Sequence, residues 1–416
     1  QYFLNRTNSV MERTSGHKVS AFQQAQYFLN RTNSVMERTS GFCGSDASCG
    51  SYSNHPTVRV AVRGWASSEF NLGSYACPRT RCVLYDYQRR HENYDILFSA
   101  LPPRQKNPAK KSMPNQRHVE LSMESSINYP SISDAGSYAE NGIDLVVSYR
   151  PPVQTNVTNF LMSSYVNAEL DAFLVRPDGS RSWPTFKERI PAMAVVIRTC
   201  KEKHVKRISI FNELIKTFSK VYKFGACFKR RHTFSPILPA QLKYCWSLPR
   251  RSAMWDAPKE CVLHHVMFSF SLENSIEEGY ITEKLWQALK MGSIPIYTVK
   301  SVPQNRNFLP HPDAALFIED FKSLKDLGEY MHAITKNETL WFKHAMAWRF
   351  LPTFRLSGNF LSAVEKSFVT LPCRLCDWWH VETQNADRLN LTFDNEANPL
   401  QKNKTQSEHG KVYDSS

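Results

Sequence analysis

The sequence lacks several features that would assign it to common classes of protein. It has no run of eighteen apolar residues and no signal peptide, so the printed chain holds no segment that could span a bilayer as a helix. It contains no Asp-x-Asp motif, which excludes that means of presenting two carboxylates to a metal ion. No RNA- or DNA-binding signature accompanies its basic residues.

The charge of the chain is strongly positive. Lysine and arginine number 52 against 38 aspartates and glutamates, for a formal net charge of +14 and an isoelectric point near 9.3. The basic residues are spread along the chain in short clusters only. We therefore expect no nucleic-acid partner, and the charge favours an anionic small ligand such as a nucleoside diphosphate.

Length and patterning indicate two domains with extensions. The 416 residues exceed one common-sized core, and 42% hydrophobic with 22% charged residues is typical of a globular protein. Residues 1–16 recur unchanged at 26–41, and their polar composition predicts a poorly ordered stalk over 1–57. Periodicity is lost after about Leu371, and the end of the chain from Asn385 is predicted to be disordered.

One stretch is more informative than the rest of the chain. Val266–Leu272 has the pattern of a buried strand, and Glu273–Tyr280 is a polar loop. Thr282 is a suitable N-cap for a helix whose apolar stripe ends at Gly292. Ile294–Tyr297 is then a second strand, so the stretch predicts a strand–loop–helix–strand unit.

The first turn of that expected helix contains Glu283 and Lys284. Unpaired backbone N–H groups and the positive end of the helix dipole favour an anion at this position. A lysine beside a helix N-terminus and a glycine-containing loop suits a phosphate group. The plainer alternative is an ordinary crossover in which both side chains are solvated.

Four groups of residues in this stretch match a known pattern at fixed spacing: Glu273-Asn274, Tyr280, Thr282-Glu283-Lys284 and Ile294-Pro-Ile-Tyr297. They closely resemble the donor-binding signature of the α1,3/α1,4-fucosyltransferases. The resemblance implies inverting transfer of L-fucose from GDP-β-L-fucose to a hydroxyl group of a glycoprotein or glycolipid glycan, with O3 of N-acetylglucosamine as the expected acceptor. It implies no tightly bound cofactor and no need for a divalent metal.

Alternating strands and helices predict an α/β protein with two Rossmann-like, doubly wound lobes facing a cleft. The resemblance implies the same GT-B architecture, with an acceptor-side lobe at 58–190 and a donor-binding lobe at 191–370. A cysteine-containing segment over 371–416 follows. Within the second lobe we expect a buried strand at Ala192–Ile197 and a helix over Ile208–Tyr222.

The leaving diphosphate needs positive charge, and Arg207 and Lys284 are the candidates. Arg207 opens a segment, RISIFNEL, that resembles the family's segment in which an arginine precedes an aromatic pair by the same step. Arginine can hold two diphosphate oxygens, whereas lysine acts as a point charge. The alternative assigns Arg207 to a basic surface run. The resemblance also implies that Tyr280 and Glu283 contact the sugar or ribose and that Asn274 shapes the loop or reaches the nucleotide.

Inverting transfer also needs a general base, for which Glu124 is the candidate. It ends the expected strand Arg117–Glu124, and strand ends that face a cleft collect catalytic groups. The segment resembles a family strand that ends in Phe-Glu-Ser-Pro and carries the proposed base. Ser126 departs from that proline and Thr298 from a glycine-containing turn. Without the resemblance, a solvent-facing glutamate is the usual outcome.

Cysteines and glycosylation sequons favour a secretory compartment. The chain has ten cysteines and six N-x-S/T sequons, a combination expected where disulfides and N-glycans form. Zinc is the competing interpretation of the Cys43/Cys49 and Cys373/Cys376 pairs. The resemblance implies a type II Golgi membrane protein with a lumenal catalytic domain, held by an anchor that would precede Gln1.

A catalytically silent, glycan-binding homologue is the alternative function. The altered surroundings of Ser125 and Thr298 favour it. The presence of Arg207, Tyr280 and Lys284 argues against it, because a binding module would not need a complete donor signature.

Overall fold

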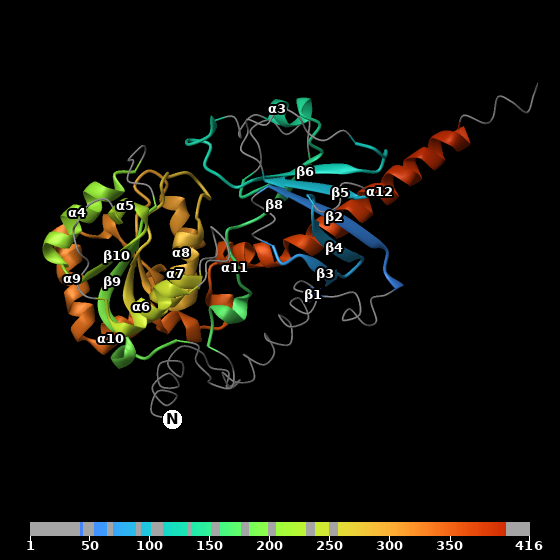
Figure 1. Ribbon diagram of the computed structural model, residues 1–416. Helices are drawn as coiled ribbons and strands as arrows, with labels where there is room; N and C mark the ends of the chain where they lie inside the picture. The colour runs from blue at the N-terminus through green and yellow to red at the C-terminus, as the bar shows by residue number, and fades with distance from the viewer. Residues whose placement is uncertain are drawn as a thin grey trace, which may run out of the picture.

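The computed structural model describes two α/β lobes, each built on its own sheet (Figure 1). The residues described are 42–44, 54–64, 70–88, 93–100, 111–130, 135–150, 159–175, 183–198, 205–229, 238–248 and 257–396. The duplicated segments 1–16 and 26–41, and the tail 397–416, lie outside them. The predicted two-lobed α/β fold, the GT-B architecture, is confirmed.

The first lobe contains an eight-stranded sheet of order β1-β3-β4-β2-β5-β6-β7-β8. Neighbouring strands from β4 to β8 are parallel, whereas β3 and β1 extend one edge in antiparallel pairing. The central strands are buried on both faces, as short apolar runs in parallel sheets usually are. The strands are β1 (Phe42–Gly44), β2 (Thr57–Gly64), β3 (Gly73–Ala76), β4 (Arg81–Asp86), β5 (Ile96–Ala100), β6 (Arg117–Ser122), β7 (Leu145–Ser148) and β8 (Asn159–Met162).

The second lobe contains a five-stranded parallel sheet of order β10-β9-β11-β12-β13. The chain goes from β9 outward to β10 and then returns to the other side of β9, so the winding direction reverses between β9 and β11. Such a reversal is where open α/β sheets bind ligands. The strands are β9 (Ile190–Val196), β10 (Val221–Phe224), β11 (Val266–Phe270), β12 (Ile294–Tyr297) and β13 (Leu316–Phe317).

Helices cover both faces of the second sheet. One face packs against α4 and α9, and the other packs against α6, α7 and α8. Among the described residues no helix is both long enough and apolar enough to cross a membrane. The helices are α3 (Ala135–Glu140), α4 (Arg207–Thr217), α5 (Ala226–Lys229), α6 (Ala240–Ser247), α7 (Ala257–His265), α8 (Glu283–Met291), α9 (Leu324–Lys336), α10 (Glu338–Ala345), α11 (Gly358–Glu365) and α12 (Leu371–Glu396).

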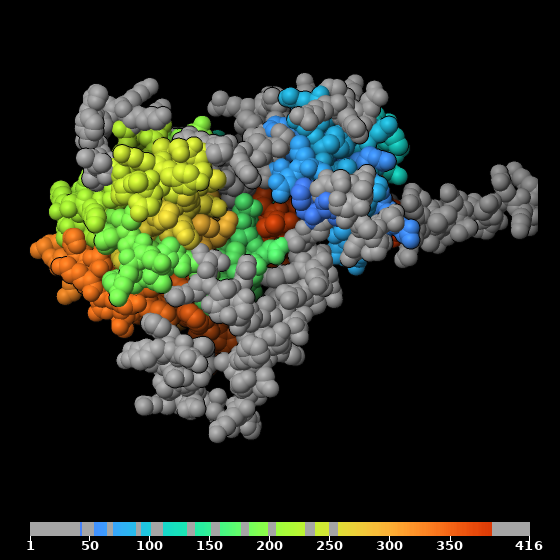
Figure 2. Space-filling view, turned by 60° about the horizontal axis from the view of Figure 1, so that its bottom comes forward, coloured from blue at the N-terminus to red at the C-terminus, as the bar shows by residue number. Residues whose placement is uncertain are grey.

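The chain passes between the lobes twice, and the two passages lie side by side. The first follows β8 and the second follows α11. The backbone N–H of Ser164 donates to the carbonyl of Lys366, and that of Phe368 donates to the carbonyl of Val166, each at 2.9 Å. In Figure 2 the red C-terminal residues are visible between the green segment and the blue first lobe. We call the paired segments 163–168 and 366–370 the crossover ribbon.

Helix α12 returns the end of the chain to the first lobe, where it packs on β2, β3 and β4 (Figure 1). Two disulfides, Cys77–Cys373 and Cys82–Cys376, join it to that lobe. The zinc interpretation of Cys373 and Cys376 is therefore wrong. The expected loss of regular structure after Leu371 is also wrong as far as Glu396. The amphipathic periodicity of this segment is too weak to predict a helix, because α12 is stabilised by its disulfides and its packing on the first lobe rather than by its own pattern.

The other sequence-based elements form with some shifted boundaries: the strand expected over Arg117–Glu124 ends at Ser122, and Phe42–Gly44, within the predicted stalk, forms β1 beside β3. The helix predicted to reach Tyr222 ends at Thr217, and Val221–Phe224 forms β10 instead. The residues Val-Tyr-Lys-Phe favour a strand and pair in parallel with β9, so tertiary pairing decides their conformation. The division between the lobes at 190/191 stays a prediction, with β9 beginning at Ile190.

Candidate functional site

The candidate site lies at the reversal point of the second sheet, at the carboxyl ends of β9 and β11. Residues 271–282, which we call the signature loop, follow β11 and lead into α8. Arg207 is the first residue of α4, the helix after β9. The two candidate cations, Arg207 and Lys284, thus both belong to the first turns of helices that begin at this edge of the sheet.

Glu273 ties the start of the signature loop to the start of α8. Its side chain is only 3% exposed. Its Oε1 accepts a hydrogen bond from the Thr282 backbone N–H at 2.8 Å, and its Oε2 accepts one from the Thr282 hydroxyl at 2.6 Å. The Thr282 hydroxyl oxygen in turn accepts from the backbone N–H of Lys284, the expected N-cap contact. These contacts assign Glu273 a structural part, which is to hold the N-terminus of α8 against the start of the signature loop.

A compact charge cluster occupies the N-terminus of α8. The Nζ of Lys284 lies 3.2 Å from Oε2 of Glu273 and 3.2 Å from Oε1 of Glu283. Burial alone would lower the pKa of Lys284, but these two carboxylates outweigh it and raise that pKa, so the ammonium stays charged. Arg207 acts on the pKa of Lys284 in the opposite direction, which places its guanidinium within electrostatic range.

Lys259 is a third cation in this cluster, and no sequence pattern points to it. It projects from α7, is mostly buried, and its Nζ lies 4.0 Å from Oε1 of Glu283. Burial lowers the pKa of Lys259. Burial would raise the pKa of Glu283, but Lys284 and Lys259 together lower it, so Glu283 is held as a carboxylate. No motif includes Lys259, because its position depends on how α7 packs beside α8.

Glu124 faces this cluster from the first lobe. The Tyr280 hydroxyl lies 3.2 Å from Oε2 of Glu124 and 3.0 Å from Oδ1 of Asn274. The ring of Tyr280 is buried between the lobes and packs against Tyr149 and Tyr165, with ring centroids 5.5 and 6.2 Å away. The structure therefore brings Glu124, Asn274 and Tyr280 together at the boundary of the two lobes.

The electrostatic surroundings of Glu124 suit a proton acceptor. The residue follows the end of β6, at Ser122, by two positions, and it is exposed to solvent, although protein atoms crowd its carboxyl group. Burial of its carboxyl group raises its pKa, and Glu283 and Glu273 raise it further, against opposing effects of Lys284 and the Tyr280 hydrogen bond. A glutamate with a raised pKa is a stronger base once ionised, which is the usual tuning of a catalytic carboxylate.

Glu277 is the second residue of the site that sequence reasoning missed. It lies within the signature loop, is 7% exposed, and its carboxylate is surrounded by side chains of the first lobe. Its partners include Ser125 and Ser126, and Ser126 stands where the family pattern has proline. Contacts between residues so far apart in the chain leave no periodic signal.

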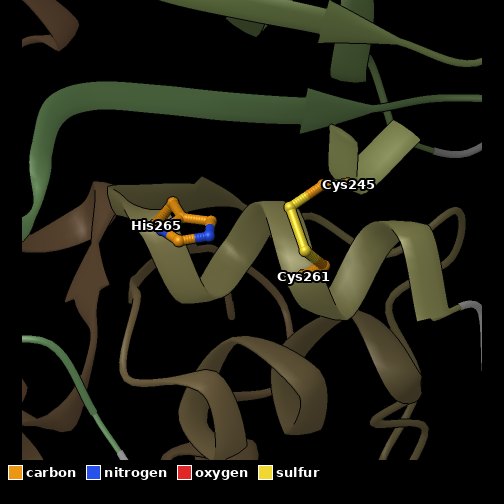
Figure 3. Close-up of side chains that lie close together, drawn as sticks. All are labelled: Cys245, Cys261 and His265. Atoms are coloured by element: carbon orange, nitrogen blue, oxygen red, sulfur yellow. A yellow bond between two sulfur atoms is a disulfide. The ribbon is translucent and has the colours of Figure 1, made fainter. Parts of the chain in front are cut away.

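A cluster with metal-ligand chemistry lies elsewhere, on α6 and α7. Ligand atoms of Cys245, Cys261 and His265 lie within 4.8 Å of one another. The two sulfurs form a disulfide (Figure 3), so their lone pairs are not those of thiolates and the group is not a metal centre in this state. Cys261 is thus a disulfide cysteine that links α7 to α6.

The sequence similarity of this chain to a known family lies in its second half. Residues 186–392 match the family described as glycosyltransferase family 10 (fucosyltransferase), C-terminal. GDP-fucose protein O-fucosyltransferase 3 of Xenopus tropicalis is 31% identical over 157 residues, which are 38% of this chain and 30% of that protein. An alpha-(1,4)-fucosyltransferase of Arabidopsis thaliana is 31% identical over 156 residues, 38% of this chain and 37% of that protein. The matches thus span about a third of these relatives' lengths.

Solved structures give a more distant likeness over a larger share of the chain. A crystal structure of an alpha1,3-fucosyltransferase matches with a TM-score of 0.41 at 14% identity, over 76% of this chain and 92% of that chain. The same protein class with GDP matches with a TM-score of 0.42 at 13% identity, over 81% of this chain and 98% of that chain.

Proposed function

We propose a function from one premise: this chain belongs to glycosyltransferase family 10, the fucosyltransferases. The reaction is transfer of L-fucose from GDP-β-L-fucose to a hydroxyl group of a glycan acceptor, with inversion at the sugar. One observation carries the proposal. A carboxyl group with a raised pKa, Glu124, lies beside the Tyr280 hydroxyl and within electrostatic range of the buried cation Lys284.

The proposed chemistry divides between the lobes. Glu124 takes the proton of the acceptor hydroxyl while the acceptor oxygen forms a bond to C1 of fucose. The bond between C1 and the diphosphate oxygen breaks, and its electron pair leaves with GDP. Arg207, Lys284 and the N-terminus of α8 stabilise the negative charge that develops on the diphosphate. Tyr280 and Glu283 contact the sugar or ribose, and Asn274 orients the Tyr280 hydroxyl.

We propose that no divalent metal is required. Two carboxylates stand nearest the helix N-terminus, and both are engaged by cations or N–H groups of the protein. Glu273 binds Thr282 and Lys284, and Glu283 faces Lys284 and Lys259. Turnover in EDTA should equal turnover in Mg²⁺ or Mn²⁺. Loss of activity in EDTA that Mn²⁺ restores would show that the cations do not replace a metal.

The decisive experiment is GDP-fucose turnover by purified variants. Glu124→Gln keeps the shape of the side chain and removes the base, so kcat should fall at least about 10²-fold. Lys284→Ala should cost about 2–4 kcal/mol of transition-state stabilisation, by analogy with a lost oxyanion-hole donor. Glu278→Gln is the matched control, because Glu278 is an exposed glutamate of the same loop. Undiminished rates in both site variants would remove this assignment.

The acceptor we propose is O3 of N-acetylglucosamine within a glycan. A second candidate is a serine or threonine hydroxyl of a protein, favoured by the similarity to a Xenopus tropicalis protein O-fucosyltransferase. Incubation with GDP-fucose and a panel of chitobiose, lactosamine and folded-protein acceptors, read by mass spectrometry, separates the two. A fucosylated protein without N-glycans would favour the second candidate, and a product only on N-acetylglucosamine would favour the first.

We propose a lumenal location in the Golgi, with a membrane anchor N-terminal to the residues printed. Supporting this are three disulfides among the described residues and a sequon at Asn337, whose side chain is exposed at the start of α10. Full-length protein expressed from its gene should sediment with Golgi membranes and lose mass on treatment with an N-glycosidase. A cytosolic, unglycosylated product would exclude this location.

A further inference from the structure

The carboxylate of Glu277 joins the two lobes through one dense set of contacts. Its Oε1 receives the Ser126 hydroxyl at 3.0 Å and the Tyr149 hydroxyl at 2.8 Å, and the Arg150 Nη1 lies 2.7 Å from the same oxygen. Its Oε2 receives the Ser125 hydroxyl at 2.7 Å. All four partners come from the first lobe, whereas Glu277 belongs to the second. We call these five residues the interlobe clasp.

The clasp holds the segment that contains Glu124. Ser125 and Ser126 directly follow it in the chain, so whatever fixes their hydroxyl groups also fixes the backbone from which Glu124 projects. The Ser125 Oγ additionally lies 2.9 Å from Oγ of the fully buried Ser275 of the signature loop. Glu124 itself makes one side-chain contact across the boundary, with Tyr280 at 3.2 Å. The strongest interlobe contacts near the base are therefore those of its two successors.

The clasp is fixed on the donor side as well. The Nδ2 of Asn305 donates to the carbonyl oxygen of Glu277 at 2.9 Å, and its Oδ1 accepts from the backbone N–H of Gly279 at 2.9 Å. Gly279 has φ of +72°, and a side chain there would contact the ring of Tyr149. The signature loop thus has one defined path between Glu273 and Tyr280, and Glu277 lies in the middle of it.

We infer that Glu277 is a positioning residue for the transfer reaction, which sets the place of Glu124 relative to the donor pocket by binding the two serines that follow it. The inference rests on the proposed function, because it takes Glu124 as the base. An error of about 1 Å in the place of a reacting group can cost about 10²-fold in rate. Two lobes joined only by flexible segments would not hold a base to that tolerance.

A positioning role of Glu277 differs from a purely structural role because its loss should leave donor affinity unchanged. The cations of the donor pocket, Lys284 and Lys259, make none of the clasp contacts given above, so donor affinity should survive loss of the clasp. The charges that act on Glu124 come from Lys284, Glu283 and Glu273. These three charges stay in place in a Glu277 variant, so a lower pKa of Glu124 there would follow from greater hydration of the base together with loss of the Glu277 charge.

The test is the kinetics of Glu277→Gln, with Glu278→Gln as the neighbouring control. Glutamine keeps the side-chain length but removes the charge and half of the accepting capacity. We expect kcat to fall about 10–100-fold while KM for GDP-fucose and the Kd for GDP change less than about twofold. We also expect the acidic limb of the kcat/KM profile to move to lower pH, because a more hydrated Glu124 has a pKa nearer the ordinary value. The control should behave as the unmodified protein.

The results distinguish the positioning role of Glu277 from the proposed transferase function on which it rests. Full activity of Glu124→Gln would refute the proposed function. Inactive Glu124→Gln together with unchanged kcat and an unchanged acidic limb in Glu277→Gln would refute the positioning role and leave the function intact. A higher KM for GDP-fucose at unchanged kcat would also refute it, because that pattern indicates a donor-binding residue.

A milder variant keeps the inference testable if Glu277→Gln does not fold. Ser126→Ala removes a single hydrogen bond from the clasp, so folding should be retained. Its kcat should fall about 2–10-fold at unchanged KM for GDP-fucose. If Glu277→Gln does fold, the combined variant should lose less than the product of the two separate losses, since both act through one contact. A Ser126→Ala enzyme with normal kcat would overturn the inference.

Discussion

Replacing Cys77 and Cys373 with alanine removes one of two disulfides that join α12 to the first lobe, and the other remains. Each bond closes a very long loop, with sequence separations of 296 and 294. Either bond alone would stabilise the fold by ~5–6 kcal/mol through the lost entropy of the unfolded chain. Once one is present, the second closes a ring of only about ten residues and adds ~3 kcal/mol.

The two disulfides should therefore be partly redundant. Loss of Cys77–Cys373 or of Cys82–Cys376 should each lower the free energy of unfolding by ~3 kcal/mol, whereas loss of both should lower it by ~8–9 kcal/mol. The packing cost of replacing buried sulfur with a methyl group adds to every variant in proportion and does not change this pattern. Strong non-additivity is thus the signature to look for.

Urea unfolding without reductant, monitored by tryptophan fluorescence and circular dichroism, measures this non-additivity. The two double variants and the fourfold variant are compared with the unmodified protein. Trp378 and Trp379 lie on α12 and report its detachment. If the fourfold loss equalled the sum of the two double losses, the entropic reasoning would be wrong for this pair of bonds. The Cys245–Cys261 bond, which spans 16 residues in the other lobe, serves as an independent reference.

Three further predictions concern the site and its support. Burial and nearby carboxylates raise the pKa of Glu124 above the ordinary value of 4.5. A base that works only when ionised should therefore lose activity as the pH falls through that raised value. An acidic limb of the kcat/KM profile at or below pH 4.5 would contradict this. Lys259→Met should raise KM for GDP-fucose about 3–30-fold with little change in kcat, as steady-state kinetics with Lys343→Met as control would show. Gly225→Ala should destabilise by about 2–4 kcal/mol, because Gly225 has φ of +97° and a Cβ would collide with the Ile197 carbonyl. Gly358→Ala, where a Cβ meets nothing within 4 Å, should leave the melting temperature nearly unchanged, and equal effects of the two would refute the argument.

Local patterns were sufficient to predict most elements of the second lobe, including those that surround the candidate site. The strand Val266–Phe270, the Thr282 cap and the left-handed Gly292 are each specified by neighbouring residues, so their positions follow from sequence alone. The signature residues then fall at the reversal point of a doubly wound sheet, where such loops must lie. Propensity and topology agree at this site.

The acceptor half of the site was less predictable because its geometry depends on distant contacts. Glu277 meets Ser125 across 152 residues, and Cys82 meets Cys376 across 294. Lys259 reaches Glu283 only because α7 packs beside α8. No period or cap encodes such pairs, so they appear only when the whole chain is folded.

The crossover ribbon bears on how the two lobes can move relative to each other. Two hydrogen-bonded strands of chain resist twisting far more than a single linker, but they can still bend across their width. We therefore expect the lobes to bend about the ribbon rather than to twist against each other. Such bending would separate the Glu277 carboxylate from Ser125 and Ser126 and then bring them together again. Admission of a substrate and alignment of the proposed base would then occur in the same movement.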